Sequence, residues 1–384
     1  MEIENDKILN KYIKNNLNYW KDYHKSENYD ENKLIEIINK YKIKICKINI
    51  NTKGVKIDKL YNTGVNDKLQ KTITFLTDIH KQYPELIISF YLCISDTLIY
   101  DNVSIYHTNG VKINNNNPII DKLNFKWGVS SCGNYIRIVD SLQIEELNYY
   151  YPCFCFERFR GGHQILFPTF GADNNNIKES NNIDPIHFND KKNNTLLFRG
   201  FNICCDINNI DKVKLVDISY CNNEKYDFKF SSNKTHPIWN KYIVSKEHLK
   251  LFKSLNILGK DVNLDEIRNY FSNDNFMSFN DIFNHKYIVT VGSAKNRKWY
   301  LSNSVIIEMQ FKNKEFFHED IFEHGKDIIY FYVDDIDTLE NNLRNINNPQ
   351  QIIDHRKKKF NKYLHYPNLV KWYGLFLTEY SKLF

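Results

Sequence analysis

The 384-residue sequence lacks any apolar run close to the ~18 residues that a membrane-spanning helix needs. Its first residues, MEIENDKILNKYIKNN, contain no apolar core and no small-residue cleavage site, so we expect no secretory signal. The final EYSKLF is not a retention signal. These absences predict a protein that is made and kept in the cytoplasm, without a transmembrane segment.

Cysteine is used sparingly and without a metal-binding pattern. The chain has eight Cys, and no CxxC or Cys/His ladder could hold zinc. Thiols stay reduced in a cytoplasm, so we expect small buried hydrophobes, with metal and disulfide roles as the alternatives. The eight are Cys46, Cys93, Cys132, Cys153, Cys155, Cys204, Cys205 and Cys221.

A large or clustered excess of basic charge is also missing. The net charge of +6 comes from 52 Lys+Arg against 46 Asp+Glu and is not gathered in one block. A dedicated nucleic-acid binder usually carries a basic stripe or a recognised module, so we expect no nucleic-acid partner. Heavy use of Asn, Lys and Ile indicates an AT-rich genome, either microbial or that of a large DNA virus, in which case the compartment is the host cytoplasm.

What the sequence does contain is enough apolar residues, 42%, for real cores, and a length that favours two domains. We predict an N-terminal domain over 1–190 that begins with a helical extension and a C-terminal domain over 195–366. A polar, Asn-rich stretch at 172–194 is the predicted linker. A last helix at 367–384 carries an apolar stripe that requires a large apolar partner.

Strands alternating with helices predict an α/β fold, with a parallel sheet in the C-terminal half. Apolar periodicity predicts helices within 7–45, over 68–83 and over 297–303, with a loop near 51–67. Continuous apolar runs predict strands at 85–95, 195–200, 213–219, 285–291, 304–309 and 327–333. Asp96 follows the first of these strands, at the edge where open α/β sheets bind ligands.

The stretch VTVGSAKNRKWYLSNSVIIE, residues 289–308, has the residues of an anion site. A buried strand leads into Gly292, Ser293 and Ala294, and then into Lys295 and Arg297. Glycine lets the backbone approach a ligand, and Arg can bind phosphate through two nitrogens. The pattern is neither GxGxxG nor GxxxxGK[ST], so it does not support a Rossmann dinucleotide site or a P-loop kinase. A solvated helix turn with surface cations is the alternative.

The longer run HKYIVTVGSAKNRKWYLSNSVIIE, 285–308, resembles the donor-site signature of glycosyltransferase family 90, the protein O-glucosyltransferase and capsule-associated xylosyltransferase group. The turn Arg of that family falls on Lys295, and Arg297 follows two positions later. Which cation contacts the diphosphate therefore stays open. The residues that match the family strand, turn and LSNSV-like segment are His285, Lys286, Tyr287, Ser293, Ala294, Leu301, Ser302, Asn303, Ser304 and Val305.

Further matches keep the order of the family and extend the resemblance over about 84–384. EFF at 315–317, LLFRG at 196–200 and the final WYGLFLTEYSKLF are similar to family segments, and so is YYPCFCF…RGG…FPT within 149–171. ELIISFYLCISD resembles the strand that ends in the catalytic Asp, which places that role on Asp96. The Pro that follows this Asp in the family is replaced by Thr97 and Leu98.

The resemblance implies a GT-B fold, in which two Rossmann-like domains face each other across a cleft and the C-terminal helix crosses back to the N-terminal domain. It implies transfer of a sugar, glucose or xylose, from a UDP-sugar with inversion to a hydroxyl of a glycan or protein. Asp96 would be the general base, and no metal or other cofactor is expected. The implied donor-binding residues are Arg199, Gly292, Ser293, Ala294, Lys295, Arg297, Ser302, Asn303, Ser304 and Glu315. The implied acceptor or sugar contacts are Tyr151, Phe154, Phe156, Gly161 and Gly162.

Each of these assignments has a plainer alternative. Asp96 could cap a turn, with Asp101 or Asp121 as the base instead. Arg199 could form a structural salt bridge, and Glu315 could hold its loop. The remaining alternatives are core packing for Tyr151, Phe154 and Phe156, helix or turn capping for Ser302 and Ser304, and ordinary polar roles for His163 and His236.

Two other functions stay open. One is a catalytically inactive protein that binds glycans or nucleotide sugars on the same fold, which the Lys at 295 and the missing Pro favour. The other is a phosphate-binding enzyme of a different kind.

Overall fold

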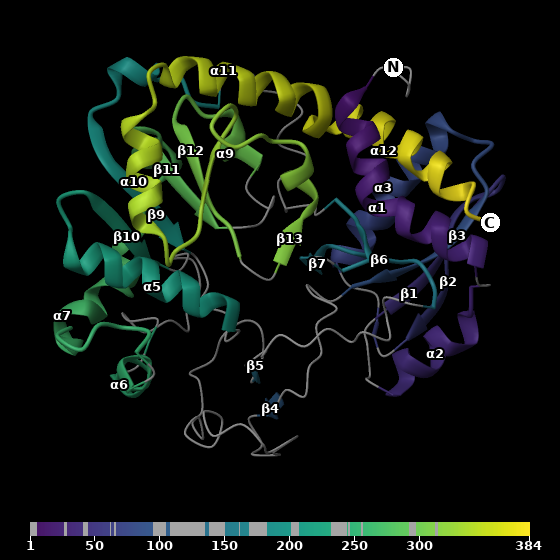
Figure 1. Cartoon of the computed structure of the whole chain (residues 1–384), viewed down its shortest axis with the longest axis horizontal. Coiled ribbons are helices and arrows are strands. Elements are labelled where there is room, and N and C mark those ends of the chain that lie inside the picture. Colours follow the sequence, from purple (N-terminus) through teal and green to yellow (C-terminus); the bar gives the residue numbers. More distant parts are fainter. Residues whose placement is uncertain are drawn as a thin grey trace.

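The chain forms a mixed α/β structure with two five-stranded sheets, described here from a computed structural model (Figure 1). No helix among the described residues is long and apolar enough to cross a bilayer. The structure describes residues 6–26, 29–40, 45–61, 63–64, 67–94, 105–107, 135–137, 150–160, 162–168, 183–200, 207–231, 244, 246–254, 256–291, 297–311 and 314–384.

The sheet of the N-terminal half has the strand order β2-β1-β3-β6-β8. β1 pairs antiparallel with both β2 and β3, whereas β3, β6 and β8 run parallel. The strands are β1 (Ile45–Asn51), β2 (Gly54–Tyr61), β3 (Ile88–Cys93), β6 (Cys153–Cys155) and β8 (Ile165–Leu166). The helices are α1 (Lys7–Ser26), α2 (Glu31–Lys40) and α3 (Asp67–Gln82). A separate pair joins β4 (Ile105–His107) to β5 (Tyr135–Arg137).

The hairpin of β1 and β2 corrects the prediction of a helix continuing to residue 45 and a loop near 51–67. Along β1, Ile48 and Ile50 are buried while Lys47 and Asn49 are partly exposed. This period of two belongs to a strand with one covered face. The helical interpretation failed because the apolar residues of the short run KIKICKINI fit the spacing of a helix as well as the alternation of a strand.

The sheet of the C-terminal half is entirely parallel, in the order β10-β9-β11-β12-β14. Alternate residues point into two different buried clusters, so both faces are covered and the strands read as continuous apolar runs. The strands predicted at 195–200, 285–291 and 304–309 are confirmed. The strands are β9 (Asn193–Gly200), β10 (Tyr226–Phe230), β11 (His285–Val291), β12 (Val305–Met309) and β14 (Ile329–Phe331).

The predicted strand at 213–219 is wrong, because these residues lie in a helix, and β10 was not predicted. Val213, Val216 and Ser219 are buried at helical spacing. Ser219 Oγ donates to the carbonyl of Tyr226 over 2.7 Å and so packs the helix on β10. The helices of this half are α5 (Ile207–Cys221), α6 (Lys246–Ser254), α7 (Leu264–Ile267), α8 (Phe279–Phe283), α9 (Arg297–Leu301), α10 (Ile336–Arg344) and α11 (Pro349–Lys359).

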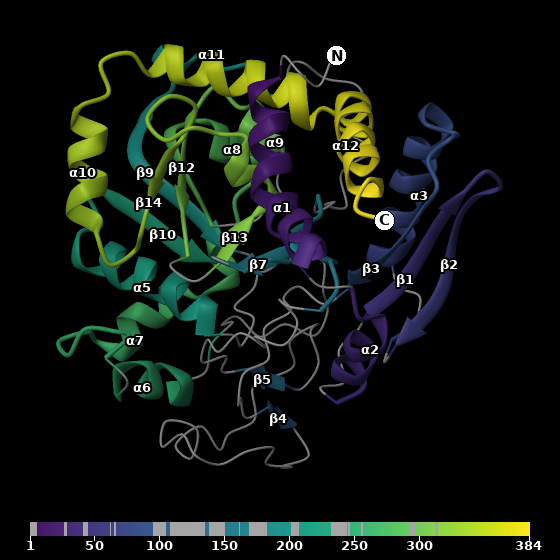
Figure 2. The same cartoon turned by 45° about the vertical axis from the view of Figure 1, so that its right-hand side comes forward.

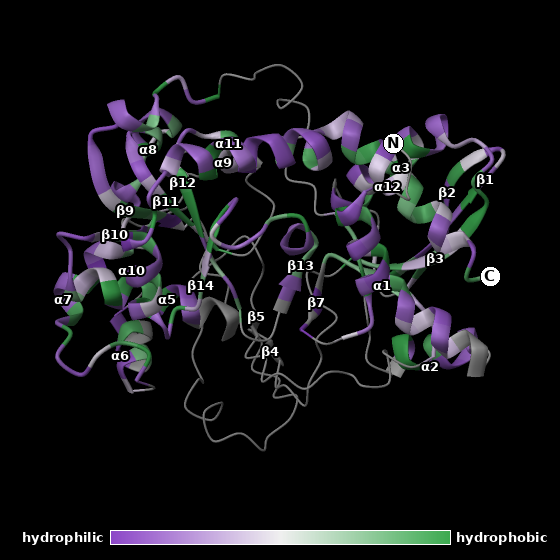
Figure 3. Cartoon of the chain, turned by 45° about the horizontal axis from the view of Figure 1, so that its top comes forward, coloured by the Kyte–Doolittle hydropathy of each residue, from purple (hydrophilic) through white to green (hydrophobic). Residues whose placement is uncertain are grey.

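The last helix, α12 (Tyr366–Ser381), packs on the N-terminal half (Figure 2). The rings of Tyr12 in α1 and Trp372 lie 4.9 Å apart, and those of Phe75 in α3 and Tyr373 lie 5.9 Å apart. α11 leads to it along the top of Figure 1 and carries mainly hydrophilic residues in Figure 3, whereas β12 beneath it is hydrophobic. The apolar stripe of the last helix therefore has its large apolar partner.

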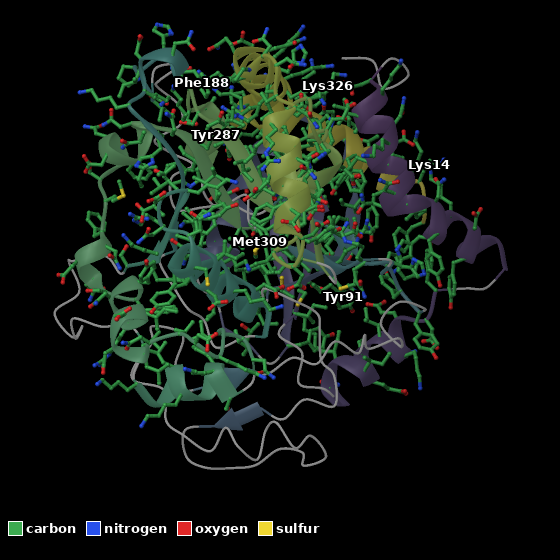
Figure 4. All side chains as sticks on the ribbon, turned by 60° about the vertical axis from the view of Figure 1, so that its left-hand side comes forward. Lys14, Tyr91, Phe188, Tyr287, Met309 and Lys326 are labelled. Carbon is green, nitrogen blue, oxygen red and sulfur yellow. The ribbon has the colours of Figure 1, made fainter. Side chains whose placement is uncertain are left out.

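The described part of the predicted linker, residues 183–194, is anchored to the C-terminal half. Lys191 and Asp184 form an ion pair of 2.8 Å, and both side chains are fully buried. The rings of Phe188 and Tyr287 meet edge to face, with centres 6.0 Å apart and planes at 85°. Both residues are labelled in Figure 4. The polar composition predicted a linker, and in its described part these two charged side chains pair inside the protein.

Candidate functional site

The parallel sheet reverses its direction of strand addition between β9 and β11. From β9 the chain adds β10 on one side, and then returns to add β11, β12 and β14 on the other side. In open α/β sheets the crevice outside the carboxyl ends of two such strands is where ligands bind. The candidate site is therefore at the carboxyl ends of β9 and β11.

The segment that leaves β11 here is the predicted anion loop. Gly292, Ser293, Ala294 and Lys295 lie outside the described residues. Arg297 begins α9, and the structure describes its backbone only. The loop thus connects two described elements, β11 and α9, at the edge where the sheet order places a ligand.

Arg199, the penultimate residue of β9, is held by protein groups. Its Nη2 donates to Oδ2 of Asp227 over 2.6 Å, and its Nε donates to the carbonyl of Asn275 over 3.1 Å. The side chain is 6% exposed. Burial alone would raise the pKa of Asp227, but Arg199 and Lys229 lower it below its ordinary value. This geometry favours the salt-bridge alternative for Arg199 over a direct role in donor binding.

The turn after α9, residues 302–304, is also occupied by internal contacts. Ser302 Oγ donates to the carbonyl of Trp299 over 2.8 Å, and Ser304 Oγ donates to the carbonyl of His285 over 2.7 Å. Asn303 donates its backbone N–H to Asp184 over 2.7 Å. These contacts favour the capping alternative for Ser302, whereas Ser304 ties the turn to β11, and neither serine has exposed surface for a nucleotide.

A two-stranded ribbon ties the carboxyl edges of the two sheets together (Figure 1). β7 (Glu157–Phe159) begins directly after β6 ends, and β13 (Lys314–Phe316) is the next strand after β12. β7 and β13 pair antiparallel. Because β3 is parallel to β6, and β9 and β11 are parallel to β12, the carboxyl ends of all these strands lie at the sheet edges that this ribbon joins.

Asp96, the predicted base, lies outside the described residues. It follows β3, which ends at Cys93, and so leaves the N-terminal sheet at the same edge as β6 and the ribbon. The fallback residues Asp101 and Asp121 are outside the described part too. The structure thus brings the strand before Asp96 and the strand before Lys295 to sheet edges that share one ribbon, without describing either side chain.

Glu315 lies in the ribbon and is paired with an arginine of the other half. Nε of Arg158 lies 2.5 Å from Oε1 of Glu315. Nη1 of the same arginine donates to Asn16 Oδ1 and to the carbonyl of Gln164, each over 3.0 Å. The side chain of Arg158 is 6% exposed and that of Glu315 is 20% exposed. This pairing favours the alternative in which Glu315 holds its loop.

The sequence reasoning missed a buried polar group behind the site. Glu308, inside β12, accepts from Tyr300 over 2.8 Å and lies 2.6 Å from Nε2 of His318. Burial opposes protonation of His318, but Glu308 and Glu319 outweigh it, so the pKa of His318 is raised above its ordinary value. A carboxylate within the apolar run SVIIEM was the signal that could have shown it.

A second ion pair between the two halves of the chain lies beside this group. Nη2 of Arg160 lies 3.0 Å from Oε2 of Glu319, which also accepts from Gln310 over 2.9 Å. Burial raises the pKa of Glu319 above its ordinary value, although Arg160 and His318 work in the opposite direction. The ribbon region is thus rich in paired charges that come from both halves.

The predicted sugar-contacting rings are mainly in the core. Phe154 is 0% exposed and Phe156 is 1% exposed, and the ring of Phe154 packs against that of Tyr380 at 4.9 Å. A ring without exposed surface offers none to a sugar, so their assignment is corrected in favour of the core alternative. Tyr151 is half-buried against Phe384. Gly162 is buried, and Gly161 lies outside the described residues.

The remaining predictions concern two histidines and the cysteines. His163 stacks on Tyr19 with ring centres 3.5 Å apart, and His236 lies outside the described residues. Cys46, Cys93, Cys153 and Cys155 are buried, as predicted, whereas Cys221 is exposed. Within the described part of the chain, no group of three or more His, Cys, Asp or Glu side chains is placed to hold a metal ion.

No family model matches this chain, and a search of curated proteins finds no match either. The resemblance to glycosyltransferase family 90 therefore depends on the ordered motifs in the sequence and stays a hypothesis. The fold and the position of the predicted loops are the structural observations that bear on it.

Proposed function

We propose that the protein is an inverting glycosyltransferase that moves a sugar from a UDP-sugar to a hydroxyl of a glycan or protein, without a metal ion. Glucose and xylose are the expected sugars. In this proposal the halves form a GT-B arrangement, with the acceptor side in residues 1–190 and the nucleotide-sugar side in residues 195–366.

The proposed chemistry needs one base and one set of cations. Asp96 takes the proton of the acceptor hydroxyl while its oxygen attacks the anomeric carbon of the sugar. The bond between that carbon and the diphosphate oxygen breaks, and the electron pair leaves with the diphosphate. Lys295 or Arg297 stabilises the departing negative charge.

One observation carries the proposal. The segments that contain the predicted base and the predicted cations both follow carboxyl ends of parallel strands, and the ribbon of β7 and β13 joins the two sheet edges where these strands end. The segment with the cations leaves β11 at the point where the strand order reverses, the place at which α/β sheets bind nucleotides. The sequence resemblance and the sheet topology thus point to the same loop independently.

The test begins with thermal shifts of the full chain in the presence of UDP and several UDP-sugars, followed by assays of UDP-sugar hydrolysis and transfer. We expect UDP to raise the melting temperature and one sugar to be turned over. Asp96→Asn should lower turnover about 10²- to 10⁴-fold while UDP binding stays intact. Asp58→Asn is the matched control, because Asp58 is exposed on β2.

Three results would count against this assignment. If UDP stabilises the fold but no donor is hydrolysed or transferred, the protein is an inactive nucleotide-sugar binder. If Asp96→Asn retains full turnover, the base is another carboxylate, with Asp101 and Asp121 the next to test. The absence of any shift with UDP would contradict the nucleotide site itself.

A further inference from the structure

Residues 302–304, the turn between α9 and β12, are fixed from outside by a single buried arginine. Arg356 of α11 donates Nε to the carbonyl of Tyr300 over 3.0 Å. Its two remaining nitrogens donate to the carbonyls of Ser304 and Ser302 over 2.8 Å and 2.5 Å. One planar guanidinium therefore holds three backbone carbonyls, one in α9 and two in the turn.

The environment of Arg356 is unusual for a charge. The side chain has no exposed surface, and no carboxylate among the described residues forms an ion pair with it. Burial lowers the pKa of Arg356 from its ordinary value to about 9. A buried cation without a paired anion costs stability, so a contribution of its charge to the folding energy does not explain this residue.

Asn303, in the middle of the turn, is held by the buried Asp184 and the partly buried Lys357. Its side-chain amide donates to the carbonyl of Asp184 over 2.8 Å, in addition to its backbone bond to the carboxylate. Lys357 Nζ donates to its amide oxygen. Asp184 in turn pairs with Lys191. The turn is thus bonded to α11 through Arg356 and Lys357, and to the segment before β9 through Asp184.

We infer that Arg356 is a positioning residue for α9, the helix that begins at Arg297. The helix has five residues and is about 7.5 Å long, so fixing its carboxyl end also fixes the backbone of Arg297, a proposed donor-binding residue. A cation at the carbonyls of a helix end also suits the helix dipole. The inference rests on the proposed function in that the loop entering α9 is taken to bind the UDP-sugar.

A different explanation is that Arg356 acts through its charge alone. The surplus of buried positive charge next to α9 would then favour the diphosphate at a distance. The two explanations predict different results for Arg356→Lys, because lysine keeps the charge but cannot hold three carbonyls in a planar fork.

The experiment compares Arg356→Lys, Arg356→Gln and the control Arg344→Gln in the full chain. Arg344 is 72% exposed and pairs with Glu340 at the surface of α10. The readouts are amide hydrogen exchange over 297–305, UDP affinity and the kcat and KM of UDP-sugar turnover. Positioning predicts faster exchange over 297–305 and about a 100-fold loss of kcat/KM in both Arg356 variants, and neither effect in the control.

Each outcome decides between the explanations. If Arg356→Lys keeps wild-type exchange and UDP affinity while Arg356→Gln loses affinity, the charge alone matters and the positioning role is overturned. Unchanged exchange in both variants overturns it too. If Arg356→Gln does not fold, the Arg356→Lys result decides alone, with Lys357→Gln as a milder change that releases only Asn303. If wild type binds no UDP, the proposed function fails, but the exchange result still decides whether Arg356 fixes the turn.

Discussion

Arg158 of β7 and Glu315 of β13 are opposite one another in the ribbon that joins the two halves, with 2.5 Å between Nε and Oε1. The arginine also reaches Asn16 of α1 and the carbonyl of Gln164, so one side chain connects three segments of the N-terminal half with the C-terminal half. The pair lies at the sheet edges where the proposed base and cations are expected.

Removing this arginine should destabilise the whole chain. Arg158→Ala leaves Glu315 without this cation and the carbonyl of Gln164 without this donor, while Asn16 Oδ1 keeps the N–H of Leu166. Breaking a buried pair in this way costs about 3–5 kcal/mol, and we expect a loss of that order in urea unfolding. Lys326→Ala is the control, because Lys326 and Glu323 are 54% and 60% exposed and such pairs contribute less than about 1 kcal/mol. Equal effects of the two substitutions would contradict a structural role for the ribbon pair.

The pair of His318 and Glu308 should make stability depend on pH. The pKa of His318 is raised in the folded protein above its ordinary value of 6.5. Its stabilising effect is therefore complete below pH 6.5 and is lost as the pH rises through the folded-state pKa. Urea unfolding of wild type between pH 5.5 and 9 should show this decrease, on the scale set by about 1.4 kcal/mol for each unit of pKa shift.

His318→Gln should remove that part of the pH dependence. Substitution of the exposed His187 by Gln should leave the wild-type profile in place. A decrease of the same size in His318→Gln would assign the effect to another group.

Gly200 ends β9 at the candidate site because a larger residue does not fit there. A Cβ atom would come within 2.5 Å of Cδ1 of Phe230, and that ring is fully buried and stacked on Phe271. Gly200→Ala should cost about 1–3 kcal/mol through overpacking. Gly64→Ala is the control, since a Cβ there meets no atom within 4 Å. Similar melting temperatures for the two variants would show that Phe230 can move aside.

Gly374 tests the contact of α12 with the N-terminal half. A Cβ atom there would come within 2.6 Å of Cδ2 of Tyr83, whose hydroxyl donates to the carbonyl of Lys371 over 2.9 Å. Gly374→Ala should therefore destabilise the protein even though alanine favours helix by about 1 kcal/mol. In the Tyr83→Ala background the same substitution should become neutral or stabilising. Additive effects of the two substitutions would contradict the contact.

The sequence alone could predict much of the C-terminal sheet, but it did not predict the helix at 213–219 or the hairpin of β1 and β2. The runs at 285–291 and 304–309 are strands buried on both faces, and this burial makes them continuous and easy to recognise. The run at 213–219 is also rich in apolar residues, but it belongs to a helix that packs one face on β10. A run this short does not distinguish a buried strand from a helix with one buried face. The hairpin of β1 and β2 was missed for the same reason.

For the candidate site, the sequence determined that a cationic segment follows a buried strand, because strand periodicity and residue type are local properties. Tertiary structure alone decided that β9 and β11 are neighbours, that β7 pairs with β13, and that the polar side chains at 302–304 turn inward. These pairings join residues far apart in the chain, and the residue pattern of one segment does not indicate which distant segment it contacts. Arg356 in a polar helix, for example, reads as a surface cation until the fold closes over it.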